Sequence, residues 1–329
     1  MEIKKMLQEE AWWILETHQL PSGAVVTRYP AGPKIVPYFA HLALYGVLAA
    51  GDYGDKVRAY LEWYVAHLER PDRFGLYGTV YDYRIAADGR EIPEESYDSS
   101  DSYAATFLSL VRRYYEATGD RAWLQAHREE LEAVAGAMLA TEHKDGLTLA
   151  RPDWPVKYLM DNCEVYRGLE DYAMLQEEVW GNDDWAGFYR RKASRVVESI
   201  RRKMWVGDGF SPLLYAAGLR LRPNWKTWYP DVLAQLFTIT CGVLEPGTPR
   251  ARQIYRSFLR NYPSWHLVPS PTEFTSPLAA WAAALVGDEE RLSTYFREVR
   301  EKVIGAGRPW PWHAAESGVL TVALRLCLQ

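Results

Sequence analysis

The sequence YDSSDSYAATFLSLVRRYYEATGD, residues 97–120, combines a polar opening with a strongly amphipathic helical pattern. Small polar residues at its start favour a helix N-terminus near Ser99, and apolar residues then recur at three- and four-residue spacing. Gly119-Asp120 ends this helix, and a second helical pattern follows at once over about 121–142. The stretch therefore predicts two antiparallel helices joined by a very short turn.

The same arrangement recurs along the whole chain. Helical patterns occur at about 2–18, 37–51, 55–68, 99–118, 121–142, 162–180, 183–204, 229–243, 249–261, 275–286, 288–303 and 314–328. Their connections alternate between long and short, and short links join antiparallel neighbours. Twelve helices in this order predict an all-α (α/α)6 toroid, which is a closed ring of six helical hairpins, formed by residues 1–329 as one domain. Two helical domains divided near Val206 remain the alternative.

One long connection changes its periodicity. Residues 74–92 alternate apolar and polar side chains around a turn at Asp88-Gly89, a pattern typical of a β-hairpin. We therefore expect a small β-hairpin in a loop at the rim of the ring.

Composition excludes several classes of partner. The formal net charge is −5, with 38 Lys and Arg against 43 Asp and Glu, which disfavours a nucleic-acid partner. The three cysteines form no Cys-x-x-Cys pair, and nothing in the sequence requires a metal or another cofactor. No apolar run approaches the roughly 20 residues that span a bilayer, and the N-terminus lacks the apolar segment of a signal peptide. We expect a cytoplasmic protein without a membrane partner.

The long connections hold the residues that could form a site. A ring of hairpins would collect these connections at one end, where functional loops stand on a rigid scaffold. The candidate catalytic residues are the carboxylates Asp101, Asp161, Glu164 and Glu316. The candidate substrate-binding residues are Tyr97, Asp98, Trp154, Trp225, Trp228, Trp265, His266, Glu273, Trp310, Trp312 and His313.

Paired carboxylates beside indole rings suit the hydrolysis of a glycoside. One carboxyl group must be neutral to protonate the leaving oxygen, and the other must be ionised to activate water or attack the sugar. We expect Asp101, and Asp161 or Glu164, as acids and Glu316 as the base of an inverting enzyme that acts on an oligosaccharide or a glycoconjugate. Aromatic rings would supply flat apolar walls for the sugar faces.

Each carboxylate also has a structural interpretation. Asp98 is a candidate N-cap for the helix after it, and Asp101 in the first turn would complement the helix dipole. Asp161-Asn162-Cys163-Glu164 has the form of a capping box. Rim carboxylates that served only as caps would favour a non-catalytic carbohydrate-binding protein. An epimerase or isomerase that uses His266 and His313 for proton transfer is a further alternative.

Three segments resemble a known family. The segment Tyr97-Asp98-Ser99-Ser100-Asp101 with Tyr114 to Asp120 looks like the "Y-x-S-x-D … Y-x-x-T-G-D" pattern of the six-hairpin glycosidases, most nearly the glucoamylase and amylo-1,6-glucosidase group. The segment 312–316, WHAAE, is similar to the "W-A-H-A-E" motif that holds the catalytic base in glucoamylases, with His one residue nearer the Trp. The segment 162–169, NCEVYRGL, resembles the start of their sixth helix. The resemblance implies the toroid fold, a glycosidase activity and Glu316 as base.

Overall fold

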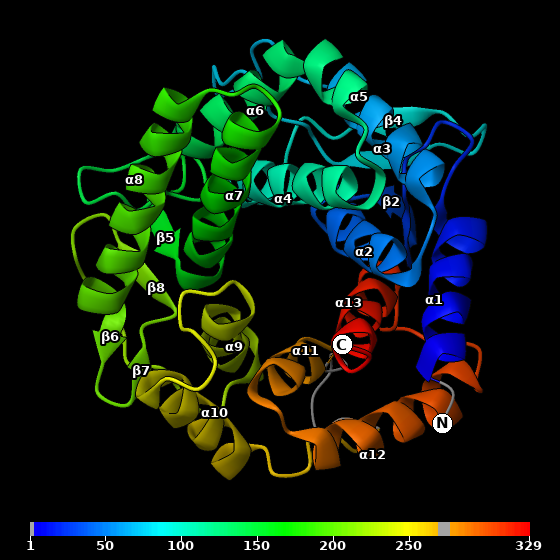
Figure 1. Cartoon of the computed structure of the whole chain (residues 1–329), viewed down its shortest axis with the longest axis vertical. Helices are drawn as coiled ribbons and strands as arrows, with labels where there is room; N and C mark the ends of the chain where they lie inside the picture. Colours follow the sequence, from blue (N-terminus) through cyan, green and yellow to red (C-terminus); the bar gives the residue numbers. More distant parts are fainter. Residues whose placement is uncertain (1–2, 269–276) are drawn as a thin grey trace.

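The computed structural model describes residues 3–268 and 277–329, and within them the helices form two concentric layers (Figure 1). The inner helices are α2 (Pro37–Ala50), α4 (Ser100–Thr118), α7 (Leu159–Glu178), α9 (Leu233–Thr240), α11 (Pro277–Val286) and α13 (Ala314–Leu326). Each inner helix packs against the next, and α13 packs against α2, which closes the ring. The predicted all-α (α/α)6 toroid is therefore confirmed.

The outer layer consists of the second helix of five hairpins and of α1, which packs against α13. Its members are α1 (Ile3–His18), α3 (Gly54–Ala66), α6 (Arg128–Leu139), α8 (Asp183–Ser199), α10 (Pro249–Asn261) and α12 (Glu289–Val299). Buried aromatic rings join the two layers. Between α3 and α4, for example, the rings of Tyr64 and Phe107 stack with their centroids 3.7 Å apart. None of the described helices is long and apolar enough to cross a membrane.

Several helices depart from the expected bounds. The pattern at 121–142 forms two helices, α5 (Arg121–Ala126) and α6, because the backbone of His127 leaves helical geometry at φ −108° and ψ 25°. The ring Nδ1 of His127 lies 2.9 Å from the carbonyl oxygen of Trp123 at the end of α5. Helix α7 begins at Leu159, three residues before the expected start. Short π-helical turns follow α8 at Ile200–Met204, precede α9 at Trp228–Val232 and follow α12 at Arg300–Ile304.

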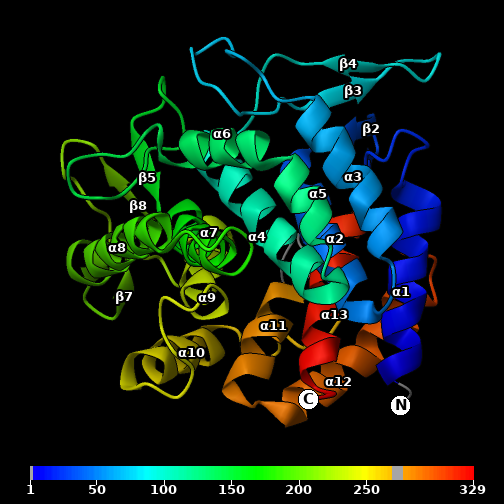
Figure 2. The same cartoon turned by 45° about the horizontal axis from the view of Figure 1, so that its top comes forward.

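A small β-sheet stands above the ring (Figure 2). The predicted hairpin at 74–92 is present as β3 (Tyr83–Ile85) and β4 (Glu91–Pro93). It is half of a four-stranded antiparallel sheet, because β2 (Gly32–Ile35) pairs with β3 and β1 (Thr27–Tyr29) pairs with β2. Two further pairs are β5 (Val156–Tyr158) with β8 (Leu213–Tyr215), and β6 (Trp205–Val206) with β7 (Gly209–Phe210).

The order of the elements fixes which end of the ring can carry a site. The first five inner helices each turn into an outer helix through a short link, and every long connection leads from an outer helix to the next inner one. The inner helices are consequently parallel, and their N-termini gather at one end with the long connections. The positive ends of the helix dipoles gather there as well.

Candidate active site

A cavity of about 980 Å³ opens among the N-termini of the inner helices. Its volume lies at the upper end of the range that is typical of ligand-binding sites. All six inner helices line it through their first turns, and the β1–β4 sheet forms a side wall. The lining residues that bear on chemistry are Tyr29, Lys34, Tyr38, Phe39, Asp82, Arg84, Glu94, Asp98, Tyr103, Asp161, Glu164, Tyr229, Phe237, His313 and Glu316.

Four of the expected residues with carboxyl groups line this cavity. Asp161 and Glu164 lie on the first two turns of α7, and Asp98 lies just before α4. Glu316 lies on the first turn of α13. In the order α2, α4, α7, α9, α11, α13, the helices α7 and α13 are three places apart, so Glu316 and the α7 carboxyl groups stand on opposite walls.

Burial favours the neutral form of the two α7 carboxyl groups. It raises the pKa of Asp161 well above its usual range, and the nearby charges of Asp101, Glu164 and Asp98 raise it further. Burial likewise raises the pKa of Glu164, although the Tyr38 hydroxyl donates a 2.7 Å hydrogen bond to its Oε1, which favours the charged form. A carboxyl group that keeps its proton near neutral pH can act as a general acid.

The expected capping roles of these residues are not formed. The N-cap of α4 is Ser99, which makes no side-chain cap hydrogen bond, and Asp98 is exposed. The N-cap of α7 is Tyr158, because the helix starts before Asp161, so the capping box is absent. Asp98 and Asp161 are thus not the N-cap residues of α4 and α7.

Asp101, the acid at the centre of the sequence motif, lies behind the cavity wall. Its side chain is fully buried and does not line the cavity. Oδ2 accepts a 2.5 Å hydrogen bond from the Thr148 hydroxyl, and Oδ1 accepts one from the Ser102 backbone N–H. Burial raises the pKa of Asp101 to about 7. Thr148 also donates its N–H to Asn162, the neighbour of Asp161, so the Asp101 network supports the start of α7.

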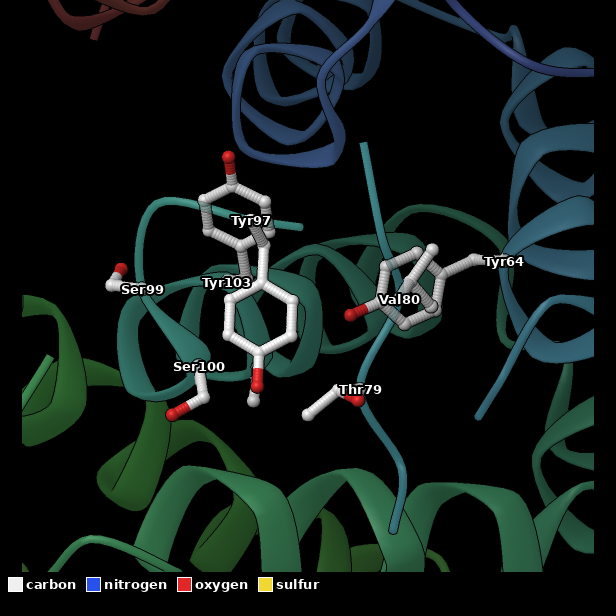
Figure 3. Close-up of a pocket in the computed structure, with 8 residues that line it drawn as sticks. Tyr64, Thr79, Val80, Tyr97, Ser99, Ser100 and Tyr103 are labelled. Atoms are coloured by element: carbon white, nitrogen blue, oxygen red, sulfur yellow. The ribbon is translucent and has the colours of Figure 1, made fainter. Parts of the chain in front are cut away.

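Tyr97 is a packing residue in this structure rather than a lining residue of the cavity. Its ring is buried beside Tyr103, next to a narrow void that has no room for a water molecule (Figure 3). Its hydroxyl donates a 2.7 Å hydrogen bond to Asp72, and its ring stacks on Tyr81. Tyr103, the other tyrosine at the start of α4, reaches the cavity, and its hydroxyl donates a hydrogen bond to Asp82.

Four of the six tryptophans expected at the rim are buried in the protein instead. Trp225, Trp228, Trp265 and Trp312 are at most 9% exposed and do not line the cavity. The expectation fails for them because the long connections fold back and bury their own large apolar rings. Trp154 and Trp310 remain 49% and 44% exposed at the rim, and the Trp310 ring contacts Tyr29 and His313.

Of the two histidines expected at the site, His313 lines the cavity and His266 does not. His313 is the N-cap of α13, and its Nδ1 accepts the backbone N–H of Ala315, which leaves the proton of the neutral ring on Nε2. Burial lowers the pKa of His313 to about 4. His266 lies beside Trp265, with ring centroids 5.9 Å apart. Glu273 lies outside the described residues.

Several cavity residues were not foreseen. Tyr38 and Phe39 begin α2 in a pattern that reads as core, and Asp82, Arg84 and Glu94 belong to the sheet. Burial raises the pKa of Asp82 to about 7, and Glu94 forms a 2.8 Å ion pair with Lys34. A sequence signal existed only for Tyr38 and Phe39, which follow Pro37 directly and hence occupy the first turn that faces the rim. Among the described residues, no group of three or more His, Cys, Asp or Glu side chains could hold a metal ion.

Comparison with known proteins finds similarity of structure without similarity of sequence. No family model and no curated protein matches the chain. A wild-type glycosidase superposes with a TM-score of 0.74 over 99% of this chain and 98% of its own, at 14% identity. A cold-adapted family 8 xylanase in complex with substrate gives 0.68 over 98% and 90%, at 9% identity. A rhamnosidase from Klebsiella oxytoca with rhamnose bound gives 0.64 over 98% and 63%, at 14% identity.

These similarities establish the fold. The matched proteins are glycosidases, in agreement with the superfamily that the sequence motifs suggest. Their sequence identities to this chain are 9–14%. The closer resemblance to the glucoamylase group stays a prediction.

Proposed function

We propose that the chain is a glycoside hydrolase whose residues 1–329 form one catalytic domain. One observation carries the proposal. The first turns of α7 and α13 both present carboxyl groups to one large cavity, and they do so from opposite walls. The similarity to glycosidases of the same fold supports it. The substrate is an oligosaccharide, as the aromatic lining suggests.

Asp161 is the general acid in this proposal. Its carboxyl group lines the cavity and is surrounded by Asp98, Asp101 and Glu164, whose negative charges oppose its ionisation. Glu164 lies on the next turn of α7 and is engaged by Tyr38. The proton therefore resides more readily on Asp161, which donates it to the glycosidic oxygen as the bond breaks.

Glu316 is the general base. Its position on α13 places it across the cavity from Asp161, so a sugar ring between them would present its leaving group to Asp161 and its opposite side to a water at Glu316. Inverting glycosidases use this arrangement, with their carboxyl groups roughly 6.5–9.5 Å apart. We therefore propose inversion of the anomeric centre.

Aromatic side chains would bind the sugar chain. Phe39, Tyr29 and Tyr229 line the cavity, and Trp310, which contacts Tyr29 and His313, extends the aromatic surface beyond them. Rings of this kind present flat apolar surfaces and place their polar edges toward water.

The two alternatives have less support. An epimerase that uses two histidines would have only His313 of the expected pair on the cavity, and the Nδ1 of His313 already caps α13. A non-catalytic binding protein would be favoured if the rim carboxylates were helix caps. Asp161 and Glu316 are not the N-caps of their helices.

A cleavage assay tests the proposal. The protein is incubated with α- and β-linked oligosaccharides labelled at their reducing ends, and products are followed by mass spectrometry and by NMR of the newly formed anomeric centre. We expect cleavage of one class with inversion, and a loss of at least about 10²-fold in kcat for Asp161→Asn and Glu316→Gln. Wild-type turnover in both variants, or a mass-neutral change of a reducing sugar, would contradict the proposal.

A further inference from the structure

Glu10, on the outer helix α1, is buried completely without lining the cavity. A carboxylate is rarely placed in a protein interior unless charged or hydrogen-bonding partners surround it. The function proposed above assigns no role to Glu10. Its partners therefore indicate what the buried charge does.

Among the described residues, the side-chain hydrogen bonds of Glu10 lead to the segment before and within the start of α13. Arg308 donates from Nη2 to Oε1 of Glu10 at 2.5 Å, and from Nε to the same oxygen at 3.1 Å. The Ser317 hydroxyl donates to Oε2 at 2.6 Å, and Trp312 Nε1–H donates to the Ser317 oxygen at 2.7 Å. The Glu10 carboxylate thus binds Arg308 and Ser317 directly, and Trp312 through Ser317, at three positions of the segment 308–317.

These three points enclose the part of the segment that reaches the cavity. Trp310, His313 and Glu316 lie between Arg308 and Ser317 in sequence, and His313 and Glu316 line the cavity. Ser317 follows Glu316 directly on α13 and is itself fully buried. The Glu10 network therefore binds the buried side of the first turn of α13, and the proposed base Glu316 lies on the cavity side of the same turn.

The backbone at Arg308 adopts an uncommon conformation. Arg308 has a φ of 58°, in the left-handed region that non-glycine residues seldom adopt. Its guanidinium group lies 4.8 Å from the centre of the Trp13 ring on α1, so α1 contributes both the carboxylate and a cation–π contact. Two independent contacts with α1 thus compensate for an unfavourable local geometry.

We propose that Glu10 is a positioning residue, which acts through Ser317 to fix the carboxylate of Glu316 and the ring of His313 at the cavity. The role of Glu316 as base rests on the proposed function, whereas the positioning itself does not. In an enzyme active site a displacement of about 1 Å can reduce turnover by about 10²-fold. The buried network would give α13 the rigidity that such precision needs.

Ser317→Ala provides the first test, because it cuts the link to α13 and Trp312 and leaves the Glu10–Arg308 ion pair intact. Crystal structures of this variant and of the wild type are compared. We expect the Glu316 carboxylate and the His313 ring to move by about 1 Å. Unchanged positions of both side chains would overturn the proposal, whether or not the protein cleaves a sugar.

Kinetics provide the second test. Ser317→Ala should lower kcat by about 10-fold or more and leave KM within about twofold, since the other cavity walls still bind the sugar. In a Glu316→Gln background the same change should cost nothing further, because Ser317 acts through Glu316. A decrease in melting temperature with an unchanged kcat would show a purely structural role and would contradict the proposal. Wild-type turnover in Glu316→Gln alone would contradict the proposed function instead.

Two further variants complete the design. Trp312→Phe removes the Nε1–H donor together with part of a buried indole ring, so it should lower the melting temperature and produce a smaller change in kcat in the same direction as Ser317→Ala. Glu9→Gln is the matched control, because Glu9 is the neighbour of Glu10 on α1 and pairs with Arg300, outside the segment 308–317. It should leave kcat and the position of Glu316 unchanged, and an equal loss of kcat in Glu9→Gln would overturn the proposal.

Discussion

The hydroxyl of Tyr38 on α2 donates a 2.7 Å hydrogen bond to Oε1 of Glu164 on α7. Helix α4 stands between these two helices in the ring, so the bond spans a corner of the cavity. The donor favours the charged form of Glu164, while burial raises the pKa of the same carboxyl group. The hydrogen bond from Tyr38 therefore stabilises the charged form of Glu164 beside Asp161.

Tyr38→Phe should raise the pKa of Glu164 further, because the hydrogen bond that favours its carboxylate is lost. NMR titration of the side-chain carboxyl carbons in glutamate-labelled protein measures this without a substrate. Tyr103→Phe is the control, since the Tyr103 hydroxyl bonds to Asp82 on the sheet and not to Glu164. An equal shift of the Glu164 signal in both variants would contradict the assignment.

Replacing Asp101 should change the pH dependence of turnover more than turnover itself. The Asp101 charge raises the pKa of Asp161, so Asp101→Asn should lower that pKa. The proposed acid would then lose its proton at a lower pH, and the alkaline limb of kcat/KM should move to lower pH. Thr148→Val removes a hydrogen bond that favours the charged form of Asp101, so it should shift the limb in the same direction by a smaller amount. A limb that stays in place in Asp101→Asn would show that Asp101 does not act on the acid.

The ring architecture could be predicted from the sequence because helix patterns and link lengths are local properties. Gly119-Asp120, for example, ends α4 with a left-handed glycine and opens the next helix, in which Asp120 caps Trp123. The sheet could not be predicted in the same way. Its central pairing joins Lys34 to Arg84 across 50 positions, and no periodicity within either strand indicates that partner.

The site was predictable to the extent that it lies on helix starts. Asp161, Glu164 and Glu316 occupy the first two turns of inner helices, so their place in the helix pattern located them at the rim. The side-chain direction within a first turn was not predictable. Asp101 lies in an equivalent turn of α4 but faces Thr148 behind the wall, which depends on how the 143–158 connection folds.

His313 should make the protein less stable in acid. Its pKa is lowered to about 4 in the folded protein, against about 6.5 in the unfolded chain, because burial disfavours the charged ring. Below pH 6.5 the unfolded chain binds a proton that the folded protein does not. The free energy of unfolding should therefore fall as the pH drops from about 6.5 to about 4, by up to about 3 kcal/mol from this group.

Urea unfolding of the wild type and of His313→Asn at pH 7.5, 5.5 and 4.5 tests this origin of the acid sensitivity. Asparagine can still cap α13, so the variant removes the titration and keeps the cap. His18, whose pKa is also lowered to about 4, contributes equally to both proteins. A variant with the same pH slope as the wild type would contradict a contribution from His313.

Closure of the ring depends on a backbone contact between its first and last inner helices. A Cβ atom added at Gly318 on α13 would lie 2.2 Å from the carbonyl oxygen of Leu42 on α2, and one at Gly46 would lie 2.4 Å from the oxygen of Gly318. Backbone atoms cannot move aside as a flexible side chain can. Gly318→Ala should therefore separate α13 from α2 and lower the free energy of unfolding by about 3 kcal/mol. Gly136→Ala on the exposed side of α6, where nothing lies within 4 Å, should instead raise the free energy of unfolding by about 0.5–1 kcal/mol.

Because Glu316 lies only two residues before Gly318, turnover should fall in Gly318→Ala and not in Gly136→Ala. Equal melting temperatures for the two variants would show that the ring can close without this contact.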